Sequence, residues 1–384
     1  MNTPRLVRPK YDGYSICNIL PSLTDIYSIK PKNNIERIPL APKIHKSLKK
    51  QTKSIKRIVI FEIDGLGFDR IIRIRNKFPF LKENVFKITS TFPTYTHSAF
   101  ASFVTGTPPS CHGLVAGTFK MGNRIKWIGE SSEEKKLILA NSLLWEFDKN
   151  GLKTYSILYD VNDDNFSKQL YPERIFIPSQ VKGKNFIEEA KIVEKRVFQE
   201  VQEFAKKDFF LLTAYFWYLD GVTGKYGKFS LESIGHCVFL FEEISKLQNT
   251  FPQDTLFIFM GDHGHTSLKK NVLLDQEKIQ EISTLSNSQL ALDGRTLMFY
   301  SKKPRLTKEL FEKYYGNYAR EIPKKDYLAL LGPKCSPEIK KRVGDFIYEA
   351  IPQHTFRLKP KDSKATHGGR SREEMETVFG FWRN

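Results

Sequence analysis

The sequence predicts an α/β protein, a three-layer sandwich with a mostly parallel central sheet and a small inserted cap. Short apolar runs rich in β-branched and aromatic residues alternate along the chain with segments of helical periodicity. Because these runs are continuously apolar, they are typical of strands buried on both faces of a parallel sheet. The length of 384 residues fits one large domain with an insertion, or two domains.

Five apolar runs are expected to form strands, at 57–63, 154–159, 209–216, 255–260 and 296–300. Four segments with helical periodicity are expected to form helices, at 98–105, 142–149, 187–205 and 231–247. Residues 1–54 are polar and rich in Lys and Pro, so we expect an extended N-terminal arm packed on the core. Residues 55–384 then form the main domain, with the cap subdomain within 268–350.

The composition indicates a folded, basic protein. Hydrophobic residues make up 40% of the chain, which excludes a disordered chain, and 61 Lys and Arg exceed 43 Asp and Glu, giving a net charge of +18. This charge favours anionic partners such as nucleotides, nucleic acid or acidic lipid. The basic residues are scattered, however, and biased coding would give a similar composition. No nucleic-acid-binding module is recognisable.

The cysteines and the N-terminus favour a soluble, cytoplasmic protein. Cys17, Cys111, Cys237 and Cys335 lie far apart, without the spacing of a zinc finger or a disulfide framework. The N-terminus lacks the apolar segment of a signal peptide, and no run of 18 apolar residues predicts a membrane span.

Acidic residues follow three of the predicted strands. Asp64, Asp220 and Asp262 come after the runs at 57–63, 209–216 and 255–260, and His263 follows Asp262 directly. Ligands of parallel sheets bind at the carboxyl ends of the strands, and carboxylates with imidazoles are ligands for a divalent cation. Asp-Gly and Asp-His-Gly are also common turn sequences, so each motif alone fits an ordinary turn.

Two further segments carry candidate groups. Thr96 lies at a predicted loop-to-helix transition, where free backbone N–H groups suit a phosphate. A cation bound to its oxygen would activate it as a nucleophile, although Thr94 or Thr96 could simply cap the helix. His367 stands beside paired glycines, which fits either a ligand or an exposed turn.

Taken together, these motifs resemble the alkaline phosphatase superfamily, specifically the compact bacterial members of its type I phosphodiesterase/nucleotide pyrophosphatase family. The similarity covers nearly the whole chain, and six motifs occur in family order. They are IDGLG (63–67), FPTYT…VTGTPPSCHG (92–113), YLDGVTGKYG (218–227), GDHGH (261–265), LLGP…RVGD (330–345) and THGGRSREEM (366–375).

This resemblance implies an alkaline phosphatase-like catalytic domain with two divalent metal ions, expected to be Zn²⁺, and a Thr nucleophile. By position, Asp64, Thr96, Asp262 and His263 would hold the metal beside the nucleophile. Asp220 and His367 would help to hold the second metal. Thr96 would attack phosphorus in line, giving a phosphothreonine intermediate that water resolves.

Two positions depart from the family pattern. Gly224 stands where the family has a His ligand of the second metal, and Gly117 stands where many members have an Asn that binds a phosphate oxygen. The second site is therefore expected to be weak, or to prefer Mn²⁺ or Mg²⁺. For His97, His236 and His265 a structural or surface role is favoured over ligation. Water or the Thr223 hydroxyl could complete the coordination.

Basic and aromatic residues surround these motifs. Arg370 and Arg372 follow His367 and could provide positive potential for a phosphate-rich substrate, or lie on a solvated loop. Arg70 belongs to a basic run that could form a charged helix face or plain surface. Three aromatic residues near the nucleophile could stack a nucleobase, although each is more often a core residue: Tyr95, Phe119 and Trp127.

The function predicted from the sequence is a metal-dependent phosphodiesterase acting on nucleotides or short oligonucleotides. One alternative is phosphomonoester or phosphonate hydrolysis within the same superfamily. The other is a degenerate protein that binds a nucleotide or a protein without turnover, which the loss at Gly224 would favour. Activity is preferred because five of the six Asp or His ligand positions are filled and Thr96 is present.

Overall fold

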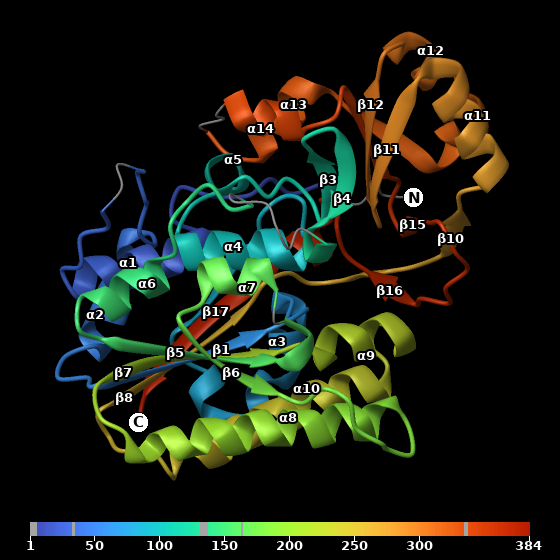
Figure 1. Ribbon diagram of the computed structural model, residues 1–384. Coiled ribbons are helices and arrows are strands. Elements are labelled where there is room, and N and C mark those ends of the chain that lie inside the picture. Colours follow the sequence, from blue (N-terminus) through green and yellow to red (C-terminus); the bar gives the residue numbers. More distant parts are fainter. Residues whose placement is uncertain (1–5, 33–34, 131–136, 163, 334–336) are drawn as a thin grey trace.

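The computed structural model describes residues 6–32, 35–130, 137–162, 164–333 and 337–384. Within this part of the chain, the largest sheet has seven strands (Figure 1). In spatial order they are β2 (Val85–Thr89), β17 (Glu376–Arg383), β8 (Thr255–Gly261), β1 (Arg57–Ile63), β7 (Phe210–Phe216), β5 (Lys153–Tyr159) and β6 (Glu173–Ile177).

The sheet is mostly parallel. β1 pairs in parallel with β7 on one side and β8 on the other, and β5 pairs in parallel with β7 and β6. Only the C-terminal strand β17 runs against its described neighbours β8 and β2. Every residue of β1, β7 and β8 is buried, as expected for strands covered on both faces.

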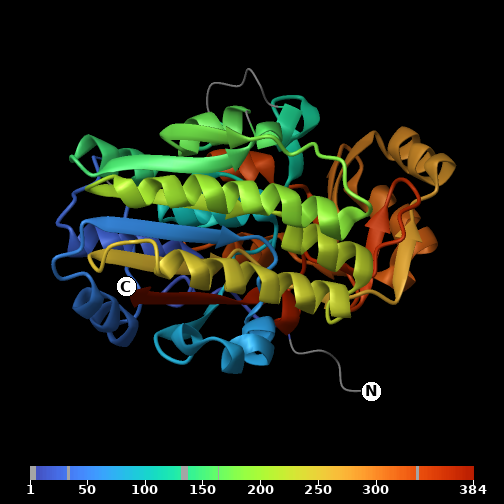
Figure 2. The same cartoon turned by 90° about the horizontal axis from the view of Figure 1, so that it is seen from below.

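Helices cover both faces of this sheet. α4 (Thr96–Thr105), α6 (Leu143–Lys149) and α1 (Ile19–Ile26) lie on one face (Figure 1). α8 (Phe186–Glu203) and α10 (Leu231–Gln248) lie side by side across the opposite face (Figure 2). The three-layer sandwich and its mostly parallel sheet are confirmed, and the predicted helices coincide with α4, α6, α8 and α10 to within a few residues.

The prediction of an extended N-terminal arm was wrong in its local structure. The described residues of 1–54 include α1 and α2 (Pro42–Gln51), which are helices. Ile19, Leu20 and Leu23 share a face of α1 that is fully buried against the core, and Pro42 suits the first turn of α2. Residues 1–5 and 33–34 of the predicted arm lie outside the described residues.

A second, antiparallel sheet occupies the region in which the sequence predicted a cap. Its strand order is β11 (Ser288–Asp293), β12 (Thr296–Ser301), β14 (Phe346–Ala350) and β13 (Ala319–Ile322). α11 (Gln276–Ser286) and α12 (Pro304–Tyr315) accompany it, with a hydrophobic core around Phe299, Phe311 and Tyr348 (Figure 1). The predicted strand at 296–300 exists, but it belongs to this sheet and not to the parallel one, because an apolar run does not encode its partners.

The remaining described helices and strands are short. They are α3 (Phe68–Ile74), α5 (Pro109–His112), β3 (Thr118–Met121), β4 (Arg124–Trp127), α7 (Asn165–Leu170), α9 (Tyr218–Tyr226), β9 (Thr266–Ser267), β10 (Lys270–Leu273), α13 (Lys324–Leu330), α14 (Pro337–Arg342), β15 (His354–Arg357), β16 (Ala365–Thr366) and α15 (Arg372–Met375).

The structure bears on the expectations for the cysteines and for membrane-spanning segments. Cys17, Cys111 and Cys237 are free thiols, and Cys335 lies outside the described residues. No helix in the described part of the chain is both long and apolar enough to cross a membrane.

Candidate functional site

The candidate site lies at the carboxyl edge of the central sheet, where three parallel strands end level with one another. Ile63 of β1 is in register with Phe216 of β7 and with Gly261 of β8. Asp64 and Asp262 follow β1 and β8 directly, and Asp220 lies in the first turn of α9, just after β7. The sheet register therefore brings together three carboxylates that are far apart in the sequence.

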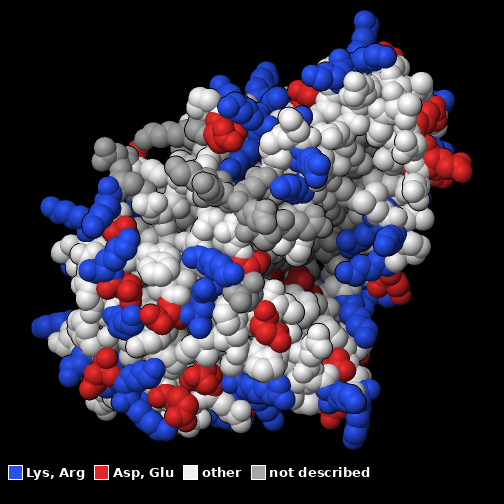
Figure 3. Space-filling view, viewed as in Figure 1, with Lys and Arg blue, Asp and Glu red and all other residues white. Residues whose placement is uncertain are grey.

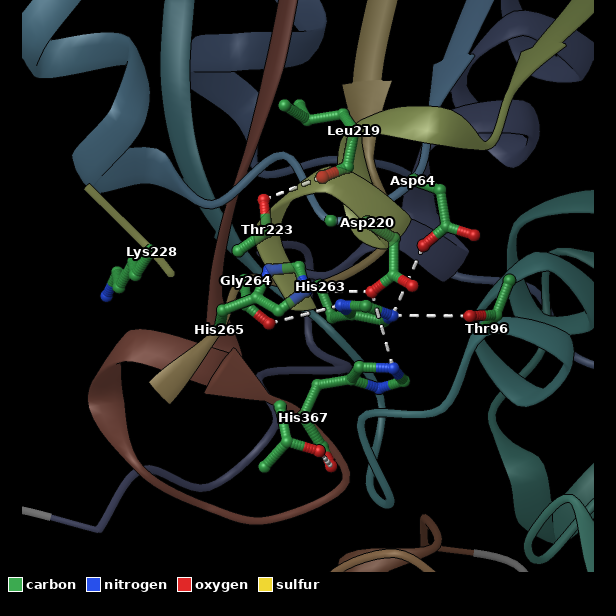
Figure 4. Close-up of polar contacts among 12 residues, drawn as sticks. Asp64, Thr96, Leu219, Asp220, Thr223, Lys228, His263, Gly264, His265 and His367 are labelled. Carbon is green, nitrogen blue, oxygen red and sulfur yellow. Dashed lines mark hydrogen bonds and ion pairs between the residues drawn. The ribbon is translucent and has the colours of Figure 1, made fainter. Parts of the chain in front are cut away.

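A two-stranded connection adds the histidines. β9 pairs with β16, with Thr266 opposite Thr366, so the segment that carries His263 and His265 lies beside the loop that carries His367. The rings of His263 and His367 stack with their centroids 3.8 Å apart (Figure 4).

The first cluster consists of Asp64, Asp262 and His263, and all three are buried. His263 Nε2 lies 3.4 Å from Asp64 Oδ1 and 3.2 Å from Asp262 Oδ2. Thr96, the first residue of α4, places its hydroxyl oxygen 3.3 Å from the same nitrogen (Figure 4). The structure thus brings four of the predicted site residues around one point.

The second cluster consists of Asp220, His263 and His367. His367 Nε2 lies 3.5 Å from Asp220 Oδ1 (Figure 4). Five of the six site residues predicted from the sequence therefore form two adjoining clusters, each of which could hold a metal ion, and the sixth, Thr96, lies beside the first cluster.

Hydrogen bonds fix the orientation of two of the imidazoles. His263 Nδ1 donates to the carbonyl of Gly264, and His367 Nδ1 donates to the carbonyl of Thr94. Because a carbonyl only accepts, each Nδ1 carries a proton, and Nε2 is the nitrogen of each ring that faces the carboxylates and is placed to bind a cation. This is the arrangement of metal-binding histidines, whose other nitrogen usually donates a hydrogen bond.

The carboxylates are poorly compensated within the protein. Asp64 Oδ1 and Asp262 Oδ2 are buried without a hydrogen-bond partner among the described residues. Burial, followed by the negative charges of Asp262 and Asp220, raises the pKa of Asp64 well above its usual range, and burial raises the pKa of Asp262 to about 7. Two buried carboxylates that face an imidazole lone pair fit a bound cation, which would stabilise their ionised forms.

The histidine pKa values fit the same arrangement. Burial lowers the pKa of His263 well below its usual value, and burial lowers the pKa of His265 to about 4. For Asp220, burial acts to raise the pKa, but the hydrogen bond from His265 and the neighbouring His367 outweigh it and the pKa is lowered. The rings are therefore neutral near pH 7, as ligation requires.

Sequence reasoning missed several groups that hold this site together. The Tyr215 hydroxyl donates to Asp64 Oδ2 at 2.6 Å, and the backbone N–H groups of Gly65 and His263 donate to Asp262 Oδ1, each at 2.8 Å. Tyr215 lies within the buried strand β7, so only the sheet register shows that its hydroxyl reaches the site. A hydroxyl in an otherwise apolar run was the one available signal.

Other residues weighed as ligands lie elsewhere or have other partners. His97 stacks on Tyr95 and contacts Phe166, with ring centroids 5.3 and 4.9 Å apart. His236 Nε2 lies 2.6 Å from the carboxylate of Glu194, and both side chains are fully buried. These contacts agree with the structural roles predicted for His97 and His236.

The Thr223 hydroxyl also has hydrogen-bond partners outside the metal clusters. It donates to the carbonyl of Leu219 at 2.6 Å (Figure 4) and accepts from the guanidinium of Arg70 at 2.7 Å. Arg70 is buried, whereas the other residues of its basic run, Arg73, Arg75 and Lys77, are exposed as expected. The space beside Gly224 is open, since a Cβ there would meet only the carbonyl of Ala365, at 3.9 Å.

The second departure from the family pattern has a steric basis. A Cβ at Gly117 would lie 2.1 Å from the Tyr95 ring, so no side chain fits at this position without moving Tyr95. The Tyr95 hydroxyl in turn accepts from Trp127 Nε1 at 3.2 Å. Phe119 is fully buried in the core and is not available to stack a nucleobase.

The basic residues after His367 are largely neutralised. Two guanidinium nitrogens of Arg370, Nη2 and Nε, donate to the same oxygen of Glu349, Oε2, at 2.7 and 2.9 Å, and Arg372 pairs with Glu376 at 2.9 Å. Lys and Arg side chains are spread over the visible face of the molecule (Figure 3). Positive charge at the site from Arg370 and Arg372 is therefore smaller than the sequence suggested.

Comparison with protein families matches residues 58–371, most of the chain, to type I phosphodiesterase / nucleotide pyrophosphatase. The chain belongs to this family. The resemblance inferred from the six motifs is confirmed, and the family indicates a hydrolase that acts on phosphate esters. No curated protein sequence matches this member of the family.

Solved structures share the fold of this family member at low identity. Phosphonoacetate hydrolase from Sinorhizobium meliloti 1021, in complex with phosphonoformate, is 15% identical, with 85% of this chain and 89% of that chain covered and a TM-score of 0.63. Murine ectonucleotide pyrophosphatase/phosphodiesterase 5, solved as an inactive variant with AMP, is 17% identical, with 85% and 87% covered and a TM-score of 0.62. The human protein of the same name is 16% identical, with the same coverage and TM-score. These likenesses confirm the alkaline phosphatase-like fold.

Proposed function

We propose that this chain is a metal-dependent phosphodiesterase/nucleotide pyrophosphatase that hydrolyses nucleotide or short-oligonucleotide phosphodiester bonds with Thr96 as the nucleophile. One observation carries the proposal. The Thr96 hydroxyl and two buried carboxylate oxygens without donors converge on the lone pair of His263, at distances of 3.2–3.4 Å.

The donor set supports two divalent cations. Asp64, Asp262 and His263, with Thr96, would hold the first, and Asp220 and His367 would hold the second. A site with few ligands, made of imidazole nitrogen and carboxylate oxygen atoms, suits Zn²⁺ at the first position. With fewer protein donors, the second position would be weaker and would also suit Mn²⁺ or Mg²⁺. When bound, the cations would lower the pKa of a hydroxyl and offset the charge of phosphoryl oxygens.

The protein's own residues would then position the reaction. Thr96 begins α4, so the free N–H groups of the first helical turn face the same side as its hydroxyl and suit a phosphoryl oxygen. Its Oγ1 would attack phosphorus while the bond to the leaving-group oxygen breaks and that oxygen takes the electron pair. Water would then attack the Thr96 ester and break the bond between phosphorus and Oγ1.

The substrate class rests on the family and on analogy of fold. Murine ectonucleotide pyrophosphatase/phosphodiesterase 5 was solved with AMP, and the bacterial relative in fold is a phosphonoacetate hydrolase. A pocket beside Thr96 is lined by the aromatic rings of Phe166, Tyr171 and Tyr215 and offers room for an apolar group near the reacting phosphorus. We also propose that the segment 268–350 acts as the cap that selects the substrate.

The decisive variant is Thr96→Ala, with Thr96→Ser as its matched control. The purified proteins would be loaded with Zn²⁺ and assayed with the nitrophenyl ester of thymidine 5′-phosphate, with circular dichroism to confirm folding. We expect Thr96→Ala to lose activity by about 10³-fold or more, and Thr96→Ser, which keeps a hydroxyl, to retain a substantial part of it. Chelation should abolish turnover by the natural protein.

Other results would select an alternative. Wild-type turnover by Thr96→Ala would place the nucleophile elsewhere. Faster hydrolysis of phosphonoacetate than of the diester would indicate a phosphonate hydrolase. Absence of metal-dependent turnover on the diester, nitrophenyl phosphate and phosphonoacetate would indicate a protein that binds without catalysis.

A further inference from the structure

His265 lies directly behind the second cluster, and the proposed metal sites give it no role. Its side chain is 1% exposed. Its Nε2 lies 2.7 Å from Asp220 Oδ1, closer than His367 Nε2, which lies 3.5 Å from the same oxygen (Figure 4). The sequence favoured a structural or surface role for this residue, and surface exposure is excluded.

The protonation of His265 differs from that of the two neighbouring histidines. His263 and His367 both donate from Nδ1 to a carbonyl, which leaves the Nε2 lone pair for a cation. His265 Nδ1 is buried with no hydrogen-bond partner among the described residues. Nε2 lies at hydrogen-bond distance from a carboxylate oxygen, which accepts, so Nε2 is the nitrogen that donates, to Asp220.

The distances support the same distinction. Two ligands that are each roughly 2.1 Å from a tetrahedral cation lie about 3.3–3.4 Å apart. The contacts within the two clusters, from 3.2 to 3.5 Å, have this spacing. The 2.7 Å contact of His265 is instead that of a hydrogen bond to a carboxylate.

The chain also makes room for this imidazole. A Cβ at Gly65 would lie 2.4 Å from His265 Cε1, and Gly65 has a φ of +74°, so both its space and its backbone conformation favour glycine. At the position where the family has a third imidazole, Gly224 leaves open space. Asp220 therefore has no histidine beside it on α9, unlike in the family pattern. His265 contacts Asp220 instead from the segment that follows β8.

We propose that His265 is a positioning residue, which donates its Nε2 proton to Asp220 and holds that carboxylate toward His367 for the second cation. The inference rests on the two-cation site proposed above. It assigns His265 no direct contact with metal or substrate. Histidine bonded to a ligating carboxylate is the kind of outer partner whose loss costs about 10–100-fold in metal affinity.

The test is titration of Zn²⁺ into the metal-stripped full-length protein by isothermal calorimetry. The variants are His265→Ala and His265→Gln, whose amide N–H reaches the position of Nε2, with His265→Asn as the shorter substitute should the alanine variant not fold. His354→Ala is the control, because His354 Nδ1 donates only to the nearby carbonyl of Pro352. Two binding events are expected for the natural protein and for the control.

We expect His265→Ala to weaken the second event by at least about tenfold and to leave the first unchanged. His265→Gln should stay within a few-fold of the natural protein, because it restores the donor. Equal loss in both variants would make His265 a ligand, and unchanged binding or weakening of both events would make its role structural. Each of these results overturns the inference while the proposed function stands. Absence of Zn²⁺ binding by the natural protein would overturn both.

Discussion

At the scale of single residues, several carboxylates at and near the carboxyl edge of the central sheet are buried with fewer hydrogen-bond donors than their ionised forms need. Asp64 and Asp262 each keep one oxygen without a donor among the described residues. Glu62, two residues before Asp64 on β1, is fully buried as well, and its Oε2 accepts from the Tyr171 hydroxyl at 3.0 Å. Such groups cost folding stability when ionised, which is typical of sites shaped by function.

Glu62 gives a prediction that is independent of metal. Burial raises the pKa of Glu62 to about 8, so the folded protein keeps the acid protonated at pH values where the unfolded chain has released the proton. The stability contributed by this group is complete below the unfolded pKa and is lost as the pH rises toward 8, at up to about 1.4 kcal/mol per pH unit.

Glu62→Gln imitates the neutral acid and should remove this loss. Relative to the natural protein, its unfolding free energy should rise by on the order of 2 kcal/mol between pH 5.5 and pH 8. Urea unfolding in the presence of a chelator measures this change in unfolding free energy. Glu309→Gln, a substitution at an exposed residue, is the control. A difference between Glu62→Gln and the natural protein that does not change with pH would show that Glu62 is ionised in the folded state.

At the scale of elements, the loop that carries His367 is attached to the segment that carries Thr96, the proposed nucleophile. The Thr94 hydroxyl donates to the carbonyl of Gly369 at 3.0 Å and accepts from the N–H of Gly368 at 2.9 Å. Its carbonyl accepts from His367 Nδ1 at 2.7 Å. Thr94 precedes Thr96 by two residues, so its hydrogen bonds link the position of His367 to that of Thr96.

Thr94→Val should test this connection. The substitution keeps the shape of the side chain but leaves the buried N–H of Gly368 without its acceptor, which should cost about 1–3 kcal/mol of stability. Because the His367 loop is then less fixed, Zn²⁺ binding at the second cluster should weaken more than binding at the first. Thermal unfolding and metal titration measure the two effects. Thr94→Ser, which keeps the hydroxyl, should match the natural protein, and normal second-site binding by Thr94→Val would contradict the account.

Much of the central sheet and its edge could be predicted because apolar runs and the polar residues after them are local in sequence. β1, β7 and β8, and the carboxylates that follow them, were visible in this way. The helices of the N-terminal segment were missed although α1 and α2 have apolar residues at helical spacing, because the polar, Lys- and Pro-rich composition of the segment suggested an extended chain.

The contacts of the histidines could not be predicted for a different reason. The position of His367 beside His263 and His265 depends on the pairing of the two-residue strands β9 and β16. Strands of this length carry no readable pattern. The hydrogen bond from Arg70 to Thr223 likewise depends on the packing of α9 against its neighbours. The spacing of residues in the sequence does not encode this packing.

At the scale of the whole molecule, buried ion pairs connect the cap sheet to the segment that carries His367. Arg295, at the turn between β11 and β12, lies 3.1 Å from Glu374, and Glu349 of β14 pairs with Arg370. The side chains of Arg295 and Glu374 are almost fully buried, so removal of either partner would leave a costly unpaired charge. These ion pairs therefore attach the antiparallel sheet of the proposed cap to the segment that carries His367.

The charge balance at this edge favours diesters over monoesters. A monoester carries more negative charge than a diester. The second cluster lacks the histidine that the family has at position 224, and Arg370 is already paired with Glu349. We expect kcat/KM for the nitrophenyl ester of thymidine 5′-phosphate to exceed that for nitrophenyl phosphate by about tenfold or more. The two substrates release the same chromophore, so one assay ranks them. A higher value for the monoester would contradict the ranking.

Mass spectrometry of the quenched enzyme would show whether Thr96 forms a bond to phosphorus, as we propose. The metal-loaded protein would be mixed with the thymidine nitrophenyl diester, stopped in acid within one turnover and digested. We expect a nucleotidyl group on the peptide containing Thr96, and none in Thr96→Ala. Rapid turnover with the nucleotidyl group on another residue, or with no adduct and full activity in Thr96→Ala, would contradict the proposal.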